Sequence, residues 1–84
     1  MKVYIVKIDY CNSRTGGRNN QLKVFANIED AETHFKQQIN YAKESCWDEF
    51  AHINKGIQIV EMWNHPDNYD KQHYRIQLIE KEVE

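Results

Sequence analysis

The chain has 84 residues, of which 40% are hydrophobic and 12% aromatic, and its formal net charge at pH 7 is −2. This length accommodates one hydrophobic core and hence one domain, residues 1–84. The apolar content excludes an intrinsically disordered chain, and the small negative charge disfavours a protein that binds phosphate backbones through a generally basic surface.

Two cysteines, Cys11 and Cys46, are too few for a disulfide framework. Residues 2–10 form a charged, alternating segment rather than the apolar region of a signal peptide. No apolar run approaches the ~18 residues of a membrane span. We therefore expect a cytoplasmic protein with reduced thiols and no membrane association.

The first half of the chain predicts a hairpin followed by a long helix. Residues 2–10 alternate as a strand does, residues 11–20 have a loop composition rich in Gly and Asn, and Gln21–Ala26 forms a second short strand. Asn27 is a competent N-cap, and acidic residues follow it. The apolar residues that define the helix recur three or four positions apart, at Ile28, Ala31, Phe35, Ile39, Ala42, Cys46, Phe50 and Ile53.

Lys55-Gly56 is typical of a helix stop, which extends the predicted helix to Ile53. A helix of that length is longer than the strands beneath it. It therefore either overhangs the sheet or breaks near Ser45–Asp48, where a Ser-x-x-Asp motif can start a new helix.

The second half predicts another pair of strands, Ile57–Trp63 and His73–Ile79, joined by a turn-rich loop around Pro66. The fold class is therefore α+β, a four-stranded, mainly antiparallel sheet (ββαββ) with one long helix packed on one face. The first and third strands are nearly continuous apolar runs, which favours them for the centre of the sheet in the order 2-1-3-4.

These strands carry more apolar surface than one helix covers. A sheet with one wet face alternates between apolar and polar residues, whereas here an apolar set remains on the uncovered side. We assign it to the end of the sheet and expect it to meet a partner or a second copy. Its members are Val3, Ile5, Phe25 and Ile79.

Three polar or nucleophilic features could in principle carry chemistry. Arg14 and Arg18 flank paired glycines that can cradle a phosphate, but P-loop spacing is missing and a solvated hairpin loop is the preferred explanation. Asp67 and Asp70 lie in a loop without calcium or zinc spacing. Cys46 falls on the core stripe of the helix, as a buried apolar residue does. We expect no catalytic residue, no metal and no cofactor.

Three aromatic residues fall where an interface can use them. Trp47 lies off the core stripe of the helix, Trp63 ends a strand, and Tyr69 sits in a loop. Exposed aromatic side chains are enriched at protein interfaces and also stack on bases. Local packing explains Trp47 equally well.

The order of elements and several short segments resemble small orphan ββαββ proteins of phages and mobile elements, including anti-CRISPR-type inhibitors. The segments are Val24-Phe25-Ala26-Asn27, Glu29-Asp30-Ala31-Glu32-x-x-Phe35, Ile59-Val60-Glu61 and Tyr74-x-Ile76-x-Leu78. The resemblance rests on layout and carries over no functional residue. It implies a non-enzymatic protein that acts by occupying a partner's surface.

The sequence thus predicts a small binding protein, self-associating or bound to a host protein. Acidic residues could engage a basic groove on that partner: Glu61, Asp67, Asp70, Glu80 and Glu82. The alternative is a small nucleic-acid or nucleotide-binding module that uses the Arg14/Arg18 glycine loop and the exposed aromatics.

Overall fold

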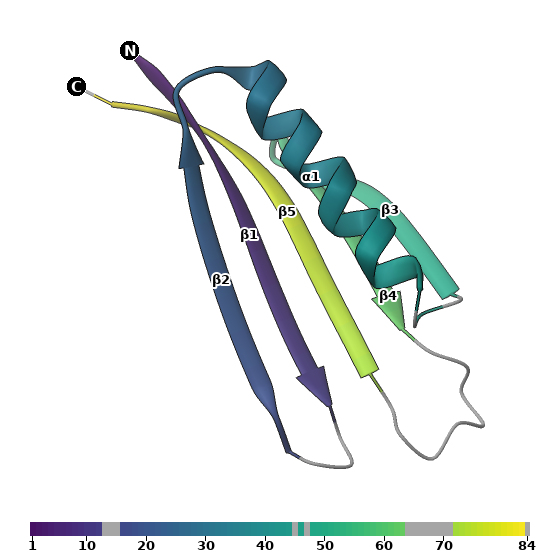
Figure 1. The fold of residues 1–84 in the computed structure, drawn as a ribbon. Coiled ribbons are helices and arrows are strands. Elements are labelled where there is room, and N and C mark those ends of the chain that lie inside the picture. Colours follow the sequence, from purple (N-terminus) through teal and green to yellow (C-terminus); the bar gives the residue numbers. More distant parts are fainter. Residues whose placement is uncertain (13–15, 45, 47, 64–71, 84) are drawn as a thin grey trace.

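Five strands and one helix make up the fold in a computed structural model, which describes residues 1–12, 16–44, 46, 48–63 and 72–83. The elements are β1 (Lys2–Asn12), β2 (Arg18–Phe25), α1 (Ile28–Lys43), β3 (Asp48–Asn54), β4 (Ile57–Trp63) and β5 (Gln72–Glu82). The strands form one sheet in the order β2-β1-β5-β4-β3, every neighbouring pair antiparallel, and α1 crosses one of its faces (Figure 1). The α+β class and the antiparallel sheet are confirmed, whereas the predicted number of four strands is wrong.

The additional strand comes from the second part of the predicted helix. α1 ends at Lys43, and residues 48–54 form β3 instead of a continuing helix. Lys55 and Gly56 have φ values of 53° and 80°, as both central residues of a type I′ hairpin turn require. The Lys-Gly pair therefore connects β3 to β4 and does not stop a helix.

The strand order also differs from the prediction. β5 pairs with β1 from Lys2↔Glu82 to Asn12↔Gln72, and its other side pairs with β4. The hairpin to β3 already occupies one side of β4, so only the other side of β4 is open to β5. The last strand is thus the centre of the sheet rather than an edge, and it extends to Glu82, three residues beyond its predicted end at Ile79.

The core lies between α1 and the sheet. Alternate strand residues point at the helix, and the helix contributes Phe35 and two alanines that allow close packing. Cys46 is 3% exposed, which confirms its predicted burial. The buried cluster comprises Val6, Ile8, Ala31, Phe35, Ala42, Cys46, Val60, Met62, Ile76 and Leu78.

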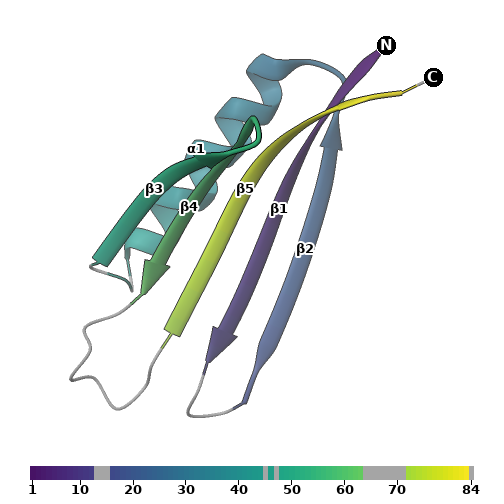
Figure 2. The ribbon, with the colours of Figure 1, turned by 180° about the vertical axis from the view of Figure 1, so that it is seen from behind.

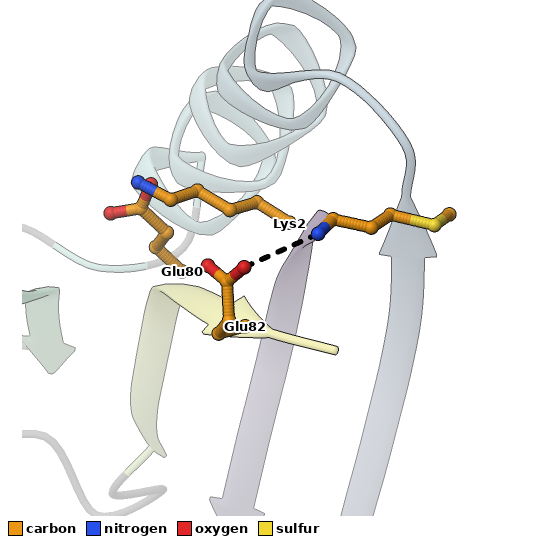
Figure 3. A network of polar contacts seen from close by, with 4 residues as sticks. Lys2, Glu80 and Glu82 are labelled. Carbon is orange, nitrogen blue, oxygen red and sulfur yellow. Dashed lines mark hydrogen bonds and ion pairs between the residues drawn. The ribbon is translucent and has the colours of Figure 1, made fainter. Parts of the chain in front are cut away.

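Both termini lie at the same end of the elongated molecule, which measures 46 × 21 × 21 Å (Figure 1). There Lys2 Nζ lies 3.2 Å from Glu80 Oε1, and the N-terminal amino group lies 3.2 Å from Glu82 Oε1 (Figure 3). The hydrogen bond and charge of Glu80 raise the pKa of Lys2. Both pairs are exposed, so each contributes little to the stability of the fold.

Candidate binding surface on the helix-free sheet face

The face of the sheet that points away from α1 is not covered by any described helix, and Figure 2 views the molecule from this side. We call it the helix-free face. Its residues are those that alternate with the core residues, because successive side chains of a strand point to opposite sides. The uninterrupted strand registers align these residues in rows that run across the sheet.

One row, near the end with the termini, is aliphatic. Ile79 lies opposite Ile5, and Ile5 lies opposite Val24. Leu22 and Val24 are 62% and 54% exposed, whereas the members on inner strands are half-buried. We name this surface the aliphatic patch, and its members are Val3, Ile5, Leu22, Val24, Ile57 and Ile79.

Three of the four predicted residues of this surface lie in the patch, namely Val3, Ile5 and Ile79. The placement of Phe25 on this face is wrong. Phe25 lies opposite Tyr4, packs against the core and has its ring 5.3 Å from that of His34. Its neighbour Val24 takes the position on the helix-free face.

A second row, farther from the termini, is charged. Arg75 lies between Glu61 on β4 and Asp9 on β1. The Glu61 carboxylate has one oxygen 3.6 Å from Nε2 of His52 and the other 3.6 Å from Nε2 of His73. Asp9 Oδ1 accepts a hydrogen bond of 2.9 Å from the Asn20 amide in the orientation that satisfies both groups. Both carboxylates thus face groups other than Arg75.

Two buried polar side-chain atoms in the described part of the chain lack a hydrogen-bond partner, His52 Nε2 and Arg75 Nε. Both belong to the helix-free face. A buried polar atom without a partner costs about 1–3 kcal/mol, and native proteins keep few of them. His52 Nε2 lies just beyond hydrogen-bond distance of Glu61 Oε2, at 3.6 Å, so Arg75 Nε is the clearer case of a donor without an acceptor.

A shallow depression of about 260 Å³ opens next to Arg75. Its lining brings Arg75 together with Arg18 and His73 from β2 and β5. The remaining lining residues are Asp9, Tyr10, Cys11 and Asn20. Arg18, predicted from the glycine loop, is therefore part of the helix-free face. Arg75 was missed because nothing in the sequence marks it apart from its alternation on β5.

Of the remaining arginine, loop aspartate and aromatic residues predicted to make contacts, the structure describes only Trp63. Trp63 is 37% exposed and its ring lies 6.3 Å from that of His73, so it extends the helix-free face at β4. Arg14, Trp47, Asp67, Tyr69 and Asp70 lie outside the described residues.

The opposite side of the sheet offers a second, weaker candidate. His34, Gln38 and Tyr41 of α1 line two shallow hollows of about 350 and 360 Å³ beside β2. Burial lowers the pKa of His34, and the nearby Lys23 lowers it further. These hollows hold no cluster of reactive groups among the described residues, and we do not assign them a ligand.

Within residues 1–12, 16–44, 46, 48–63 and 72–83, no three His, Cys, Asp or Glu side chains are placed to hold a metal ion. No helix in the same part of the chain has the length and apolar character needed to cross a membrane. Comparison of the chain with protein-family models, with curated proteins and with solved structures finds no match.

Proposed function

We propose that this protein is a small cytoplasmic binding protein without enzymatic activity, and that it acts by laying its helix-free face on another protein surface. One observation carries the proposal: the aliphatic patch is continuous across strands and shares its face with Arg75, whose Nε has no acceptor among the described residues. An apolar area on the same face as charged groups is the composition of an interface with an apolar core and a polar rim.

The face defines the chemistry of its partner. The partner presents an apolar centre to the patch and a carboxylate beside it to Arg75, because these groups complement what is left unsatisfied. The sheet face measures roughly 700 Å² from its strand lengths and spacings, close to the ~800 Å² that each side contributes to a standard interface.

The resemblance to small phage and mobile-element proteins supports an inhibitory version of this role. Occupying a partner's surface blocks that surface without any chemistry. A small rigid α+β domain with an aliphatic contact face suits such an inhibitor.

The alternative is a nucleotide or nucleic-acid binder, and one observation favours it: Arg18, His73 and Arg75 line the same depression. A salt titration separates the two functions. Labelled DNA or RNA is expected not to bind, since the net charge is −2. An affinity that falls roughly a hundredfold between low and moderate salt would show phosphate contacts and contradict our proposal.

The contact face is tested by replacing Val24 in the full chain with a benzophenone amino acid and irradiating cells that express it. The matched control carries the same group at the exposed helix residue Lys36, on the other side of the sheet. We expect a protein adduct of discrete mass at position 24 and none at 36. The adduct should be identified by mass spectrometry, reproduced with the purified pair and lost when Leu22→Asp is added. The same adducts at both positions, or none at position 24, would overturn the proposal.

A further inference from the structure

We propose that the protein surface bound by the helix-free face is the same face of a second copy, with the two sheets packed face to face. The inference rests on the proposed function and names its partner. The two-fold axis runs along the strands between β1 and β5. Face-to-face packing of this kind is a common solution for two antiparallel sheets.

The position of the axis follows from the charged row. Rotation about a line between β1 and β5 places β5 over β1 of the second copy and β4 over its β2. Arg75 then meets Asp9 of the second copy, and the symmetric contact repeats this pair, since an interface of this symmetry uses each patch twice. An axis along β5 itself would instead place Arg75 over Arg75 and Glu61 over Asp9, which like charges disfavour.

The same rotation also matches the apolar residues. Ile79 meets Ile5, and Ile57 meets Val24 of the second copy. In the row between the aliphatic and charged rows, Leu22 lies over Ile59; since Ile59 is only 2% exposed in its own chain, this pair buries mainly Leu22. No further pair of described residues contains two like charges. These pairs are Gln77 with Lys7, His73 with Cys11, Lys81 with Val3, Glu61 with Asn20, and Trp63 with Arg18. Because aligned sheets cross at about 30°, these pairs are closest near the axis.

The arrangement gives the arginine a partner of opposite charge. Arg75 is only partly buried, so Asp9 of the second copy can meet the exposed part of its guanidinium group, although Nε itself is already shielded within the chain. A pair of this kind inside an interface gives specificity, because removing one member leaves the other charge buried. The face is thus complementary to itself in apolar content and in charge.

The mass of the full chain in solution, measured by sedimentation or light scattering, tests the inference. The wild type is expected to be a dimer. Asp9→Arg and Arg75→Asp each place like charges across the axis, so each variant alone should self-associate at least about tenfold more weakly. The two variants mixed should form a one-to-one heterodimer. In that heterodimer the native Arg75 of the first variant meets the native Asp9 of the second, and the two substituted side chains form the other pair of opposite charges.

Mixing distinguishes contacts between chains from contacts within one chain, since it cannot repair a defect inside a monomer. Lys36→Glu makes a charge change of the same size on α1 and should leave the dimer intact. Circular dichroism establishes that the variants fold. If either charge variant does not fold, Val24→Asp at its exposed position replaces it and should give a monomer.

Three outcomes would overturn the inference: a monomeric wild type, a dimer unaffected by both charge reversals, or variants that stay monomeric on mixing. A dimer that survives the reversals would be joined elsewhere, for example through the edges of β2 or β3. A monomeric wild type with a foreign adduct at position 24 leaves the proposed function standing. The absence of any adduct there removes both.

Discussion

Met62 and Ile76 lie on neighbouring strands and have no exposed surface. Core interiors are close-packed, so a shortened side chain there leaves a cavity that the surroundings fill only in part. Both residues face α1 and the aromatic ring of Phe35 on the other side of the core. At the scale of single residues, the stability of this small domain depends on such positions.

Met62→Ala is therefore expected to lower the free energy of unfolding by about 2–5 kcal/mol. That is a large part of the roughly 5–10 kcal/mol available to a domain of this size. Leu22→Ala, at a residue 62% exposed, is the control and should cost about 0.5 kcal/mol or less in the monomer. Urea unfolding at a concentration that keeps the wild type monomeric measures both. Equal losses for the two variants would contradict the assignment of the core.

His34 gives the stability of the protein a pH dependence with a definite sign. Burial and Lys23 lower its pKa in the folded protein below the ordinary value of 6.5. Between the two pKa values the unfolded chain binds more protons than the folded one, so stability falls as pH decreases through 6.5. The loss levels off below the pKa of the folded form.

The urea midpoint of the wild type should thus decrease more between pH 7.5 and pH 5 than that of His34→Gln, which cannot titrate. Other groups titrate in both proteins, and the comparison cancels them. A larger decrease in the variant would reverse the assigned direction.

Val24, and not Phe25 as predicted, lies on the helix-free face. Alternation along a strand defines two sets of residues but does not say which set faces the helix. Alternation separates the residues of β2 into two sets, and Leu22 and Val24 form the more apolar set, which the sequence places inside. In the structure seven of the eight β2 residues are exposed, because α1 runs towards β3 and leaves most of β2 uncovered (Figure 1). Because β2 is an edge strand that the helix barely covers, burial does not favour either of its two faces for the apolar residues. The inward set is therefore decided by pairing with β1, which the sequence does not display.

At the scale of elements, the first part of α1 was predictable and its end was not. The Asn27 side chain accepts from Asp30 N at 2.8 Å, and acidic residues follow in the first turn, as the sequence indicated. Beyond Lys43 the three-and-four spacing continues through Phe50 to Ile53. Those two residues are 54% and 74% exposed on β3, so their spacing reflects no shared buried face. A short strand with few apolar residues imitates the helical period by chance.

The Lys55-Gly56 pair marks the β3–β4 hairpin turn, whereas the spacing of the apolar residues wrongly suggested a helix. Gly56 has φ of 80°, a conformation that side chains rarely adopt, and an added Cβ would meet no atom within 4 Å. Gly56→Ala should therefore cost about 1–2 kcal/mol through backbone strain alone. Lys55→Gly, at φ of 53°, makes the reverse change and should stabilise by a smaller amount or remain neutral. Thermal unfolding compares them, and a Gly56→Ala variant as stable as the wild type would exclude the turn.

At the scale of the whole molecule, β5 determines whether the sheet exists. It joins the β1–β2 hairpin to the β3–β4 hairpin, and Ile76 and Leu78 are part of the core. The sequence marked β5 as apolar on one face but could not place it in the centre. Strand order depends on which edges remain free after the hairpins form, and this is a property of the assembled sheet.

Deleting residues 76–84 should therefore abolish the cooperative unfolding transition, because each hairpin alone is too small to be stable. Deleting residues 83–84 leaves β5 intact and serves as the control, with a folded circular dichroism spectrum expected. A shortened chain lacking residues 76–84 that still melts cooperatively would show that the two hairpins join without β5.

The central place of β5 has a consequence for the synthesis of the protein. The ribosome releases the two hairpins before the strand that connects them, so β1 and β4 each emerge with one edge unpaired. Unpaired strand edges on a growing chain are sites where neighbouring chains associate. Until β5 is made, the nascent chain depends on whatever shields those two edges, and slower translation of the last residues would lengthen that exposure.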